Sequence, residues 1–294
     1  MSTPSALLHA LGQTRSLPGL RQLDAAGELT RMIPELEQGR GFQQPELHHF
    51  DVLQHNFAAV AALDLVLAPG PENSELRDAL AWVDLDRSLD RQIDGMPLAS
   101  LVRLGCLLHD VAKPDTATMV DGRLRFPRHG PRGAELMRDR LPLLGFGPAA
   151  THFVATLIKH HLRPGELVRK GPPTDRAVRK FVADLDGHVL PLMLVNLCDG
   201  MATKGPGYTP DNYQRHCTLV NYVVARAWAA NEEGEPPLVT GDDLIAELDL
   251  SGGRLLGAVL TSVRRAQHEG AISDRRDALA LARSVLAKLR AEQE

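Results

Sequence analysis

Seven histidine and aspartate side chains lie in or beside the apolar segments of this chain. They are His55, His109, Asp110, His129, His160, His161 and Asp199. Any one of them alone has a simpler explanation, because a buried histidine often only hydrogen-bonds to a carbonyl. Together they supply imidazole nitrogens and carboxylate oxygens, the ligands of Mn, Fe, Co, Ni and Zn, and a carboxylate can bridge two ions. Two ions a few ångströms apart activate a phosphoryl group and a water, which is the chemistry of phosphoester hydrolysis.

The stretch LGCLLHDVAKPDT contains the adjacent pair His109 and Asp110. A nearly unbroken apolar run ends at this pair, so both side chains are expected to leave water when the chain folds. Burying a carboxylate and an imidazole is unfavourable unless something pairs with them. A metal ion fits that requirement.

Helices are expected to position these residues. The segment HHFDVLQHNFAAVAALDLVL, residues 48–67, is apolar on nearly every side, which predicts a largely buried helix carrying His55. A second helix is predicted from about residue 98 to the His109-Asp110 pair, with Pro114 beyond it. His129 stands just ahead of another helix, His160 and His161 end the next, and Asp199 lies in a further apolar helix. Asp51, one helical turn before His55, is a candidate extra ligand or outer-shell partner.

Composition indicates an all-α fold. Of the 294 residues 44% are hydrophobic and only 4% aromatic, and few runs show the alternation of β-strands. We expect N-terminal neck helices in residues 1–44, a helical-bundle domain in 45–232 and a small C-terminal helical segment in 233–294, after a composition shift at EGEPPLVTGDD. No membrane span and no signal peptide are recognisable, which favours a cytoplasmic protein. The three cysteines match no disulfide or zinc pattern and are expected to be buried thiols.

Charge is distributed unevenly along the chain. Residues 123–180 contain 13 Lys and Arg against 4 Asp and Glu, a balance of +9, whereas residues 45–122 contain 5 against 13, a balance of −8. A basic segment can attract phosphate groups, but it can equally be a solvated helix face balanced by acidic neighbours. The overall charge of −4 argues against tight, nonspecific RNA binding.

The seven residues resemble the motif of the HD superfamily of metal-dependent phosphohydrolases, whose core is a His, an adjacent His-Asp pair and a later Asp. Two-metal members, such as the HD-GYP phosphodiesterases, add one His and then a His-His pair before the last Asp. The resemblance implies two divalent transition-metal ions. It assigns one ion to His55, His109, Asp110 and Asp199, and the other to Asp110, His129, His160 and His161.

The same resemblance gives Lys113 a role beside Asp110 in catalysis, since the family commonly has a lysine there that contacts substrate phosphate. Its alternative role is to complement the helix dipole. Arg128, Arg132 and Arg163 lie near the second ion's ligands in sequence and are candidate phosphate-binding residues, or else ordinary surface arginines.

The flanking segments resemble the bacterial CCA-adding tRNA nucleotidyltransferases and their poly(A) polymerase relatives. LTRMIPELEQGRGFQQPELHHFDVLQH looks like their neck, and PPLVTGDDLIAELDLSGGRLLGAVLTSVRRAQHEGAISDRRDAL looks like their C-terminal segment. A Gly-Ser followed by an Asp-x-Asp strand, the mark of their catalytic head, does not open this sequence. We therefore expect a chain that does not add nucleotides by itself.

Three functions agree with these resemblances. The first is a phosphodiesterase that acts on 2',3'-cyclic phosphate nucleotides or RNA 3' ends, with some phosphomonoesterase activity. The second is a tRNA-binding body that partners a separately encoded nucleotidyltransferase subunit. The third is a nucleotidase or deoxynucleotide triphosphohydrolase. The first is favoured, because histidines in an apolar environment have no physical reason to persist at a disused site.

Overall fold

The structure is a computed structural model of the whole chain. It describes residues 3–45, 49–68, 77, 79–80, 85–168, 173–185, 188–232, 238–239, 241–248, 255–256, 259–260, 262–263, 266 and 272–291. The chain separates into two compact units, residues 1–227 and 228–294, which are treated one at a time below. Unit 1 includes both the predicted neck and nearly all of the predicted bundle domain.

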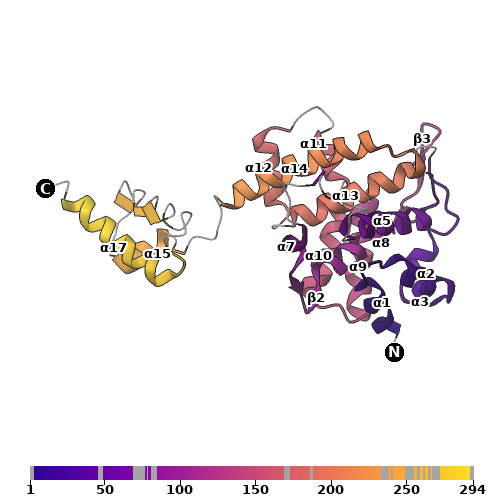
Figure 1. Cartoon of the computed structure of the whole chain (residues 1–294), viewed down its shortest axis with the longest axis horizontal. Helices are drawn as coiled ribbons and strands as arrows, with labels where there is room; N and C mark the ends of the chain where they lie inside the picture. The colour runs from indigo at the N-terminus through magenta and orange to yellow at the C-terminus, as the bar shows by residue number, and fades with distance from the viewer. Residues whose placement is uncertain are drawn as a thin grey trace. The chain divides into compact units, whose positions relative to one another are not determined.

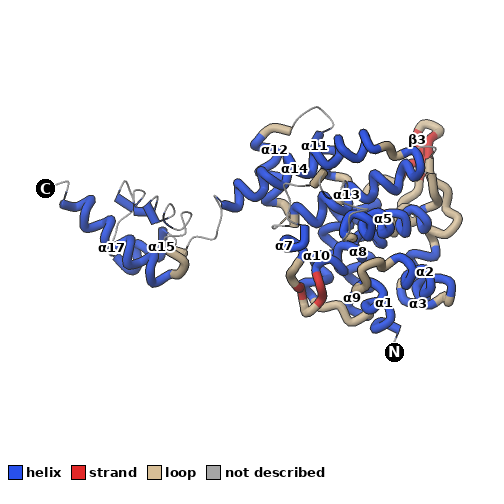
Figure 2. Tube along the Cα trace, viewed as in Figure 1, coloured by secondary structure: helices blue, strands red, loops and turns tan. Residues whose placement is uncertain are grey.

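Unit 1 is built almost entirely from helices, which confirms the all-α prediction (Figures 1 and 2). Its centre consists of four helices that pack on one another, with a fifth, α9, against α10. These five are α5 (Val52–Leu67), α8 (Leu98–Leu108), α10 (Pro148–His160), α13 (Val189–Lys204) and α9 (His129–Leu143). The predicted burial of α5 is confirmed, because Leu53, Phe57 and Leu63 are fully enclosed.

Four short helices form the N-terminal region and pack against this centre. They are α1 (Thr3–Leu11), α2 (Leu17–Ala25), α3 (Glu28–Met32) and α4 (Pro34–Glu37). Asp64 of α5 joins the N-terminal region to the centre, because its carboxylate accepts hydrogen bonds from the backbone amides of Ser16 (2.7 Å) and Leu17 (2.9 Å). Arg103 of α8 donates from Nε to the same carboxylate at 2.8 Å. A buried carboxylate with these partners ties three parts of unit 1 together.

The other helices among the described residues of unit 1 lie around the centre. They are α7 (Leu85–Leu89), α11 (Arg163–Val168), α12 (Asp175–Ala183), the 3-10 helix η2 (Gly205–Gly207) and α14 (Pro210–Glu232), which extends across the division into unit 2.

Two small antiparallel hairpins interrupt the helices, and sequence reasoning did not predict them. Strand β1 (Gln92–Ile93) pairs with β2 (Met96–Pro97), and β3 (Thr118–Val120) pairs with β4 (Arg123–Arg125). Each turn is an Asp-Gly dipeptide with positive φ at both residues, 50° at Asp121 and 70° at Gly122 in the second hairpin. Asp-Gly is a strong local signal for such turns, so the sequence did contain the information.

Unit 2 has an apolar core of its own. Helices α15 (Gly241–Leu248) and α17 (Arg275–Ala291) contribute Leu244 and Ala282 to it, together with Val259 and Val263.

The three cysteines are buried free thiols, as predicted. Among the described residues, no helix has both the length and the apolar composition needed to span a membrane.

Candidate metal centre

Five helices bring the predicted ligands together inside unit 1, and His160 and His161 lie at the end of one of them, α10. His109 directly follows α8 and Asp110 lies in the turn after it, while His129 begins α9 and Asp199 lies in α13. His55 lies in the first part of α5, whose start is fixed by Asp51. The Asp51 carboxylate accepts from the backbone amides of Gln54 (2.7 Å) and Gly41 (3.0 Å), so it caps the helix and positions His55 through the backbone.

The first group of ligand atoms comes from His55, His109, Asp110 and Asp199, all within 4.8 Å of one another. His55 Nε2 lies 3.2 Å from Asp110 Oδ2 and 3.1 Å from Asp199 Oδ1. His109 Nε2 lies 3.0 Å from His55 Nε2 and 3.4 Å from Asp110 Oδ2. These are the four residues that the resemblance assigned to one ion.

The second group comes from Asp110, His129 and His161, again within 4.8 Å. His129 Nε2 and His161 Nε2 lie 3.2 Å and 3.5 Å from Asp110 Oδ1, and 3.1 Å from each other. Asp110 therefore presents Oδ2 to the first group and Oδ1 to the second. A carboxylate that divides its oxygens in this way is suited to bridge two ions.

The orientation of three histidine rings indicates that both groups can bind a cation. His109, His129 and His161 each have Nδ1 at 2.7–2.8 Å from the backbone carbonyl three residues earlier. A carbonyl can only accept, so Nδ1 carries a proton, and each ring in its neutral form would turn the lone pair of Nε2 toward the centre. Two such lone pairs, on His129 and His161, face each other at 3.1 Å. This arrangement is unfavourable unless a proton or a metal ion lies between them, and it is the arrangement that metal-binding histidines use.

Electrostatics also favour a cation at the first group. Burial acts to raise the pKa of Asp110, but Lys113 and His109 outweigh it and hold that pKa well below its ordinary value. Burial acts to lower the pKa of His109, but Asp110 and Asp199 raise it well above normal. The carboxylates are thus ionised, and the centre attracts a proton that a metal ion would displace on binding.

Gly130 lets α9 approach α10 closely enough to pair His129 with His161. A Cβ at this position would lie 3.0 Å from both the Ile158 and the Lys159 carbonyl oxygens. Ile158 supplies the carbonyl that accepts from His161. The small residue therefore places the start of one helix beside the end of the other.

His160 is the one predicted ligand that the structure leaves outside both groups. It is half-buried, and burial together with Arg163 and Lys159 lowers its pKa to about 4. Its assignment to the second ion stays a prediction from the resemblance.

Lys113 is buried and contacts the shared carboxylate. Its Nζ lies 2.5 Å from Asp110 Oδ2, donates to Gln44 Oε1 at 2.6 Å, and lies 5.5 Å from the centroid of the Phe126 ring. The lysine therefore lies at the edge of the centre, and its role toward substrate phosphate stays a prediction from the resemblance. Sequence reasoning missed Gln44, since nothing in its local sequence distinguishes it.

The three predicted phosphate-binding arginines differ in their contacts. Arg132 Nε pairs with Asp115 at 2.6 Å, and Arg163 pairs with Asp184 at 2.8 Å. Arg128 is exposed, and its side chain has no ion pair with any described residue. The phosphate-binding role of all three stays a prediction.

Asn196 and His216 were also missed by sequence reasoning. Asn196 Nδ2 donates to the His161 carbonyl at 3.0 Å, and His216 Nε2 donates to Asn196 Oδ1 at 2.9 Å. Through these contacts, α13 and α14 fix the position of the C-terminal end of α10. No local sequence signal marks them, because they depend on the packing of α14 against α13.

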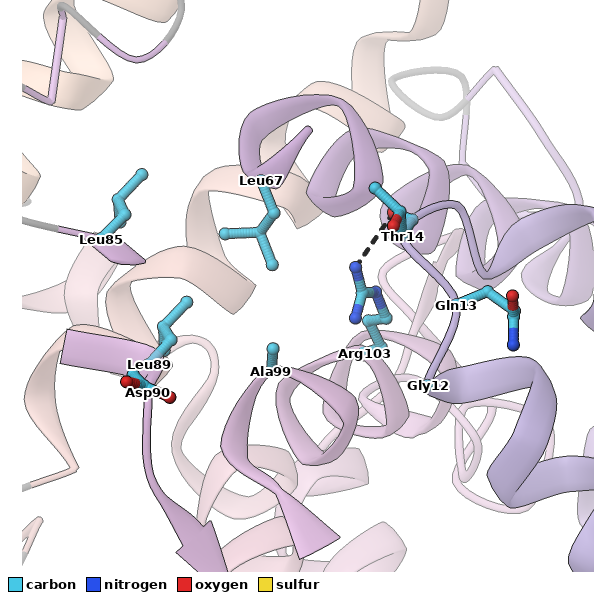
Figure 3. Close-up of a pocket in the computed structure, with 9 residues that line it drawn as sticks. All are labelled: Gly12, Gln13, Thr14, Leu67, Leu85, Leu89, Asp90, Ala99 and Arg103. Carbon is cyan, nitrogen blue, oxygen red and sulfur yellow. Dashed lines mark hydrogen bonds between the residues drawn. The ribbon is translucent and has the colours of Figure 1, made fainter. Parts of the chain in front are cut away.

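A cavity of about 530 Å³ lies elsewhere in unit 1 and contains none of the metal-group residues (Figure 3). Its walls include Leu67, Leu85 and Ala99. The guanidinium of Arg103 borders it but already donates to Asp64, Leu11 O and Thr14 O. The Arg103 guanidinium therefore already has hydrogen-bond partners within the protein.

The family comparison identifies the domain that contains several of the predicted ligands. A family model described as HD domain matches residues 87–185, a range that includes His109, Asp110, His129 and His161. The chain contains an HD domain, as the His-Asp pattern predicted. His55 and Asp199 lie outside the matched range and join the centre through α5 and α13.

Homology extends well beyond the HD domain. The chain is 30% identical over 276 residues to an A-adding tRNA nucleotidyltransferase of Deinococcus radiodurans, covering 93% of this chain and 56% of the relative. It is 27% identical over 278 residues to a CC-adding tRNA nucleotidyltransferase of Thermus thermophilus, covering 93% and 54%. The chain thus spans about half the length of these relatives. A bifunctional uridylyltransferase/uridylyl-removing enzyme of Bradyrhizobium diazoefficiens is 26% identical over 189 residues, or 64% of this chain and 18% of the relative.

Proposed function

We propose that this chain is a metal-dependent phosphohydrolase, with 2',3'-cyclic phosphate ends of nucleotides or RNA as its favoured substrates. The observation that carries the proposal is the division of the Asp110 carboxylate between two ligand groups. Two bound ions, with Mn, Fe, Co, Ni and Zn as the candidates, would activate the phosphoryl group and a water.

The residues of the chain contribute binding and orientation. In His109, His129 and His161, Nδ1 donates a hydrogen bond to a backbone carbonyl. This hydrogen bond holds each ring with Nε2 directed at the centre. Lys113 brings a buried ammonium to the shared carboxylate, where it can stabilise negative charge that develops on a phosphate.

The test is hydrolysis by metal-stripped protein with Mn, Co, Ni, Mg or Zn added back, using 2',3'-cyclic nucleotides and bis(p-nitrophenyl) phosphate. Because loss of an outer-shell partner already costs about 10–100-fold, Asp110→Ala should reduce turnover by at least about a hundredfold. Asp115→Ala, which removes an exposed carboxylate nearby in the chain, is the matched control and should remain active. Absence of turnover with every metal, despite bound metal, contradicts the proposal.

A second candidate is a tRNA-binding body, alone or with a separate nucleotidyltransferase subunit. It is favoured by the tRNA nucleotidyltransferases to which 93% of the chain aligns. Specific tRNA binding without turnover would select it. Nucleoside triphosphates in the same assay test the third candidate, a nucleotidase or triphosphohydrolase.

A further inference from the structure

The β3–β4 hairpin is an exposed arm that carries positive charge. Cross-strand partners Thr118 and Arg125, and Val120 and Arg123, place both arginines on one face of the ribbon. Both arginines are exposed, and so is Arg128 just after the hairpin. Met119 and Val120 are also exposed, at 64% and 46%, so folding leaves apolar surface uncovered on the same arm.

The base of this hairpin is attached to the candidate metal centre. Phe126, the residue after β4, accepts a hydrogen bond at its carbonyl from His129 Nδ1 at 2.8 Å. Its ring lies 5.5 Å from Lys113 Nζ and makes an edge contact with Phe42 at 6.3 Å between centroids. These contacts fix the arm at the edge of the site. An extended strand advances about 3.3 Å per residue, so Arg123 lies roughly 10 Å along the arm from Phe126.

The arginines of the arm are available for an external anion. Elsewhere in the basic segment, Arg132, Arg140 and Arg163 each pair with a carboxylate of this chain. Arg123, Arg125 and Arg128 have no such side-chain pair among the described residues. A free phosphate or a mononucleotide held at the metal groups is too small to reach several arginines spread along the ribbon.

We propose that the β3–β4 hairpin binds the RNA strand that leads to a 3'-terminal phosphate held at the metal centre. Arg123 and Arg125 contact backbone phosphates, and Val120, which lies on the same face of the ribbon as these arginines, packs against an unstacked base. This inference rests on the proposed phosphohydrolase function and specifies a polynucleotide rather than a mononucleotide substrate.

The experiment compares full-length wild type with the double variant Arg123→Gln/Arg125→Gln. Binding of a short fluorescent single-stranded RNA ending in a 2',3'-cyclic phosphate is measured by anisotropy over a range of salt concentrations. We expect roughly tenfold weaker binding and a salt slope smaller by about 1.4, because each phosphate contact to a single strand contributes about 0.7 to the slope. A second variant, Arg15→Gln/Arg31→Gln, removes two exposed arginines of the N-terminal region and should bind as wild type does.

Hydrolysis separates this inference from the proposed function. With Mn added, the hairpin variant should raise KM for the RNA and leave turnover of a 2',3'-cyclic mononucleotide unchanged. Weak RNA binding by the wild type, or equal loss in both double variants, overturns the inference even if mononucleotides are hydrolysed. A third outcome is selective loss of RNA binding in the hairpin variant when neither wild type nor variant hydrolyses any substrate. It would support RNA binding by the hairpin and contradict the proposed phosphohydrolase function.

Discussion

Asp110 determines the character of the site at the level of single residues. It is almost fully buried and ionised, and its two oxygens are shared between the Nε2 atoms of four histidines and the Lys113 ammonium. A buried carboxylate needs compensating positive charge, and one lysine compensates for only one of the two carboxylates at the first group. The local chemistry therefore favours cations before any substrate arrives.

His161 and His160 provide the first test of the ligand set. In the structure His161 faces Asp110 and His160 does not belong to either group. We expect His161→Ala to lose the second ion, lowering the metal content measured by elemental analysis from two per chain toward one. His160→Ala should weaken metal binding by less than about tenfold, which is below the roughly 10–100-fold cost of losing an outer-shell partner. Equal loss in both variants would contradict this arrangement and restore His160 as a ligand.

His216 predicts how stability changes with pH. Burial lowers its pKa to about 4, whereas an unfolded histidine titrates near 6.5. Its Nε2 donates to Asn196 Oδ1 at 2.9 Å and its Nδ1 lies 3.1 Å from the Tyr208 hydroxyl, so both ring nitrogens have partners in the fold without a second proton. Between these pH values the unfolded chain binds the proton, so the free energy of unfolding falls as pH falls from about 6.5 to 4, by roughly 3 kcal/mol at most.

Urea unfolding of metal-free protein at a series of pH values measures this effect. His216→Gln should flatten the dependence in that window, whereas His9→Gln, at an exposed histidine, should leave it as in wild type. Identical profiles for wild type and His216→Gln would show that His216 does not stay neutral in the fold.

At the level of elements, the second ligand group depends on how closely α9 meets the end of α10. Gly130 and Gly133 both face that contact, and a Cβ at Gly133 would lie 3.0 Å from the Ile158 side chain. Backbone carbonyls cannot move aside as a flexible side chain can. The contact at Gly130 is therefore the stricter of the two.

We expect Gly130→Ala to separate His129 from His161 by a few tenths of an ångström. The second ion should then bind at least tenfold more weakly, while the first, held by α5, α8 and α13, is retained. Mn titration followed by electron paramagnetic resonance distinguishes a coupled pair from single ions. Gly165→Ala, where an added Cβ meets nothing within 4 Å, is the control. A coupled-pair signal of normal affinity in Gly130→Ala would contradict the role assigned to this glycine.

At the level of the whole molecule, every predicted ligand lies in unit 1, and the core of unit 2 contains none of them. Homology to tRNA nucleotidyltransferases nevertheless covers 93% of the chain. Metal binding should therefore stabilise one unit only. A ligand present at 100 times its Kd adds about 2.7 kcal/mol per site to the state that binds it.

Hydrogen exchange measured region by region can test this. Mn should slow exchange in α8, α10 and α13 of unit 1 and leave α17 of unit 2 unchanged, and EDTA should reverse the effect. Asp110→Ala should show no Mn-dependent protection. Equal protection of α17 would show that the two units respond to metal together.

The sequence by itself determined the helical class, the buried α5 and the types of residue at the site. Apolar periodicity, prolines and the His-Asp pair are local signals that depend only on neighbouring residues. The Asp-Gly hairpins belong to the same kind of information, although they were not predicted.

Only the tertiary structure decided which ligands meet. His160 and His161 are adjacent and chemically identical, but successive residues on a helix point about 100° apart, so packing against α9 selects His161. The same holds for Arg132 and Arg163, which pair with carboxylates 17 and 21 residues away in the chain. Residue type defines what a side chain can bind, whereas long-range packing defines what it reaches.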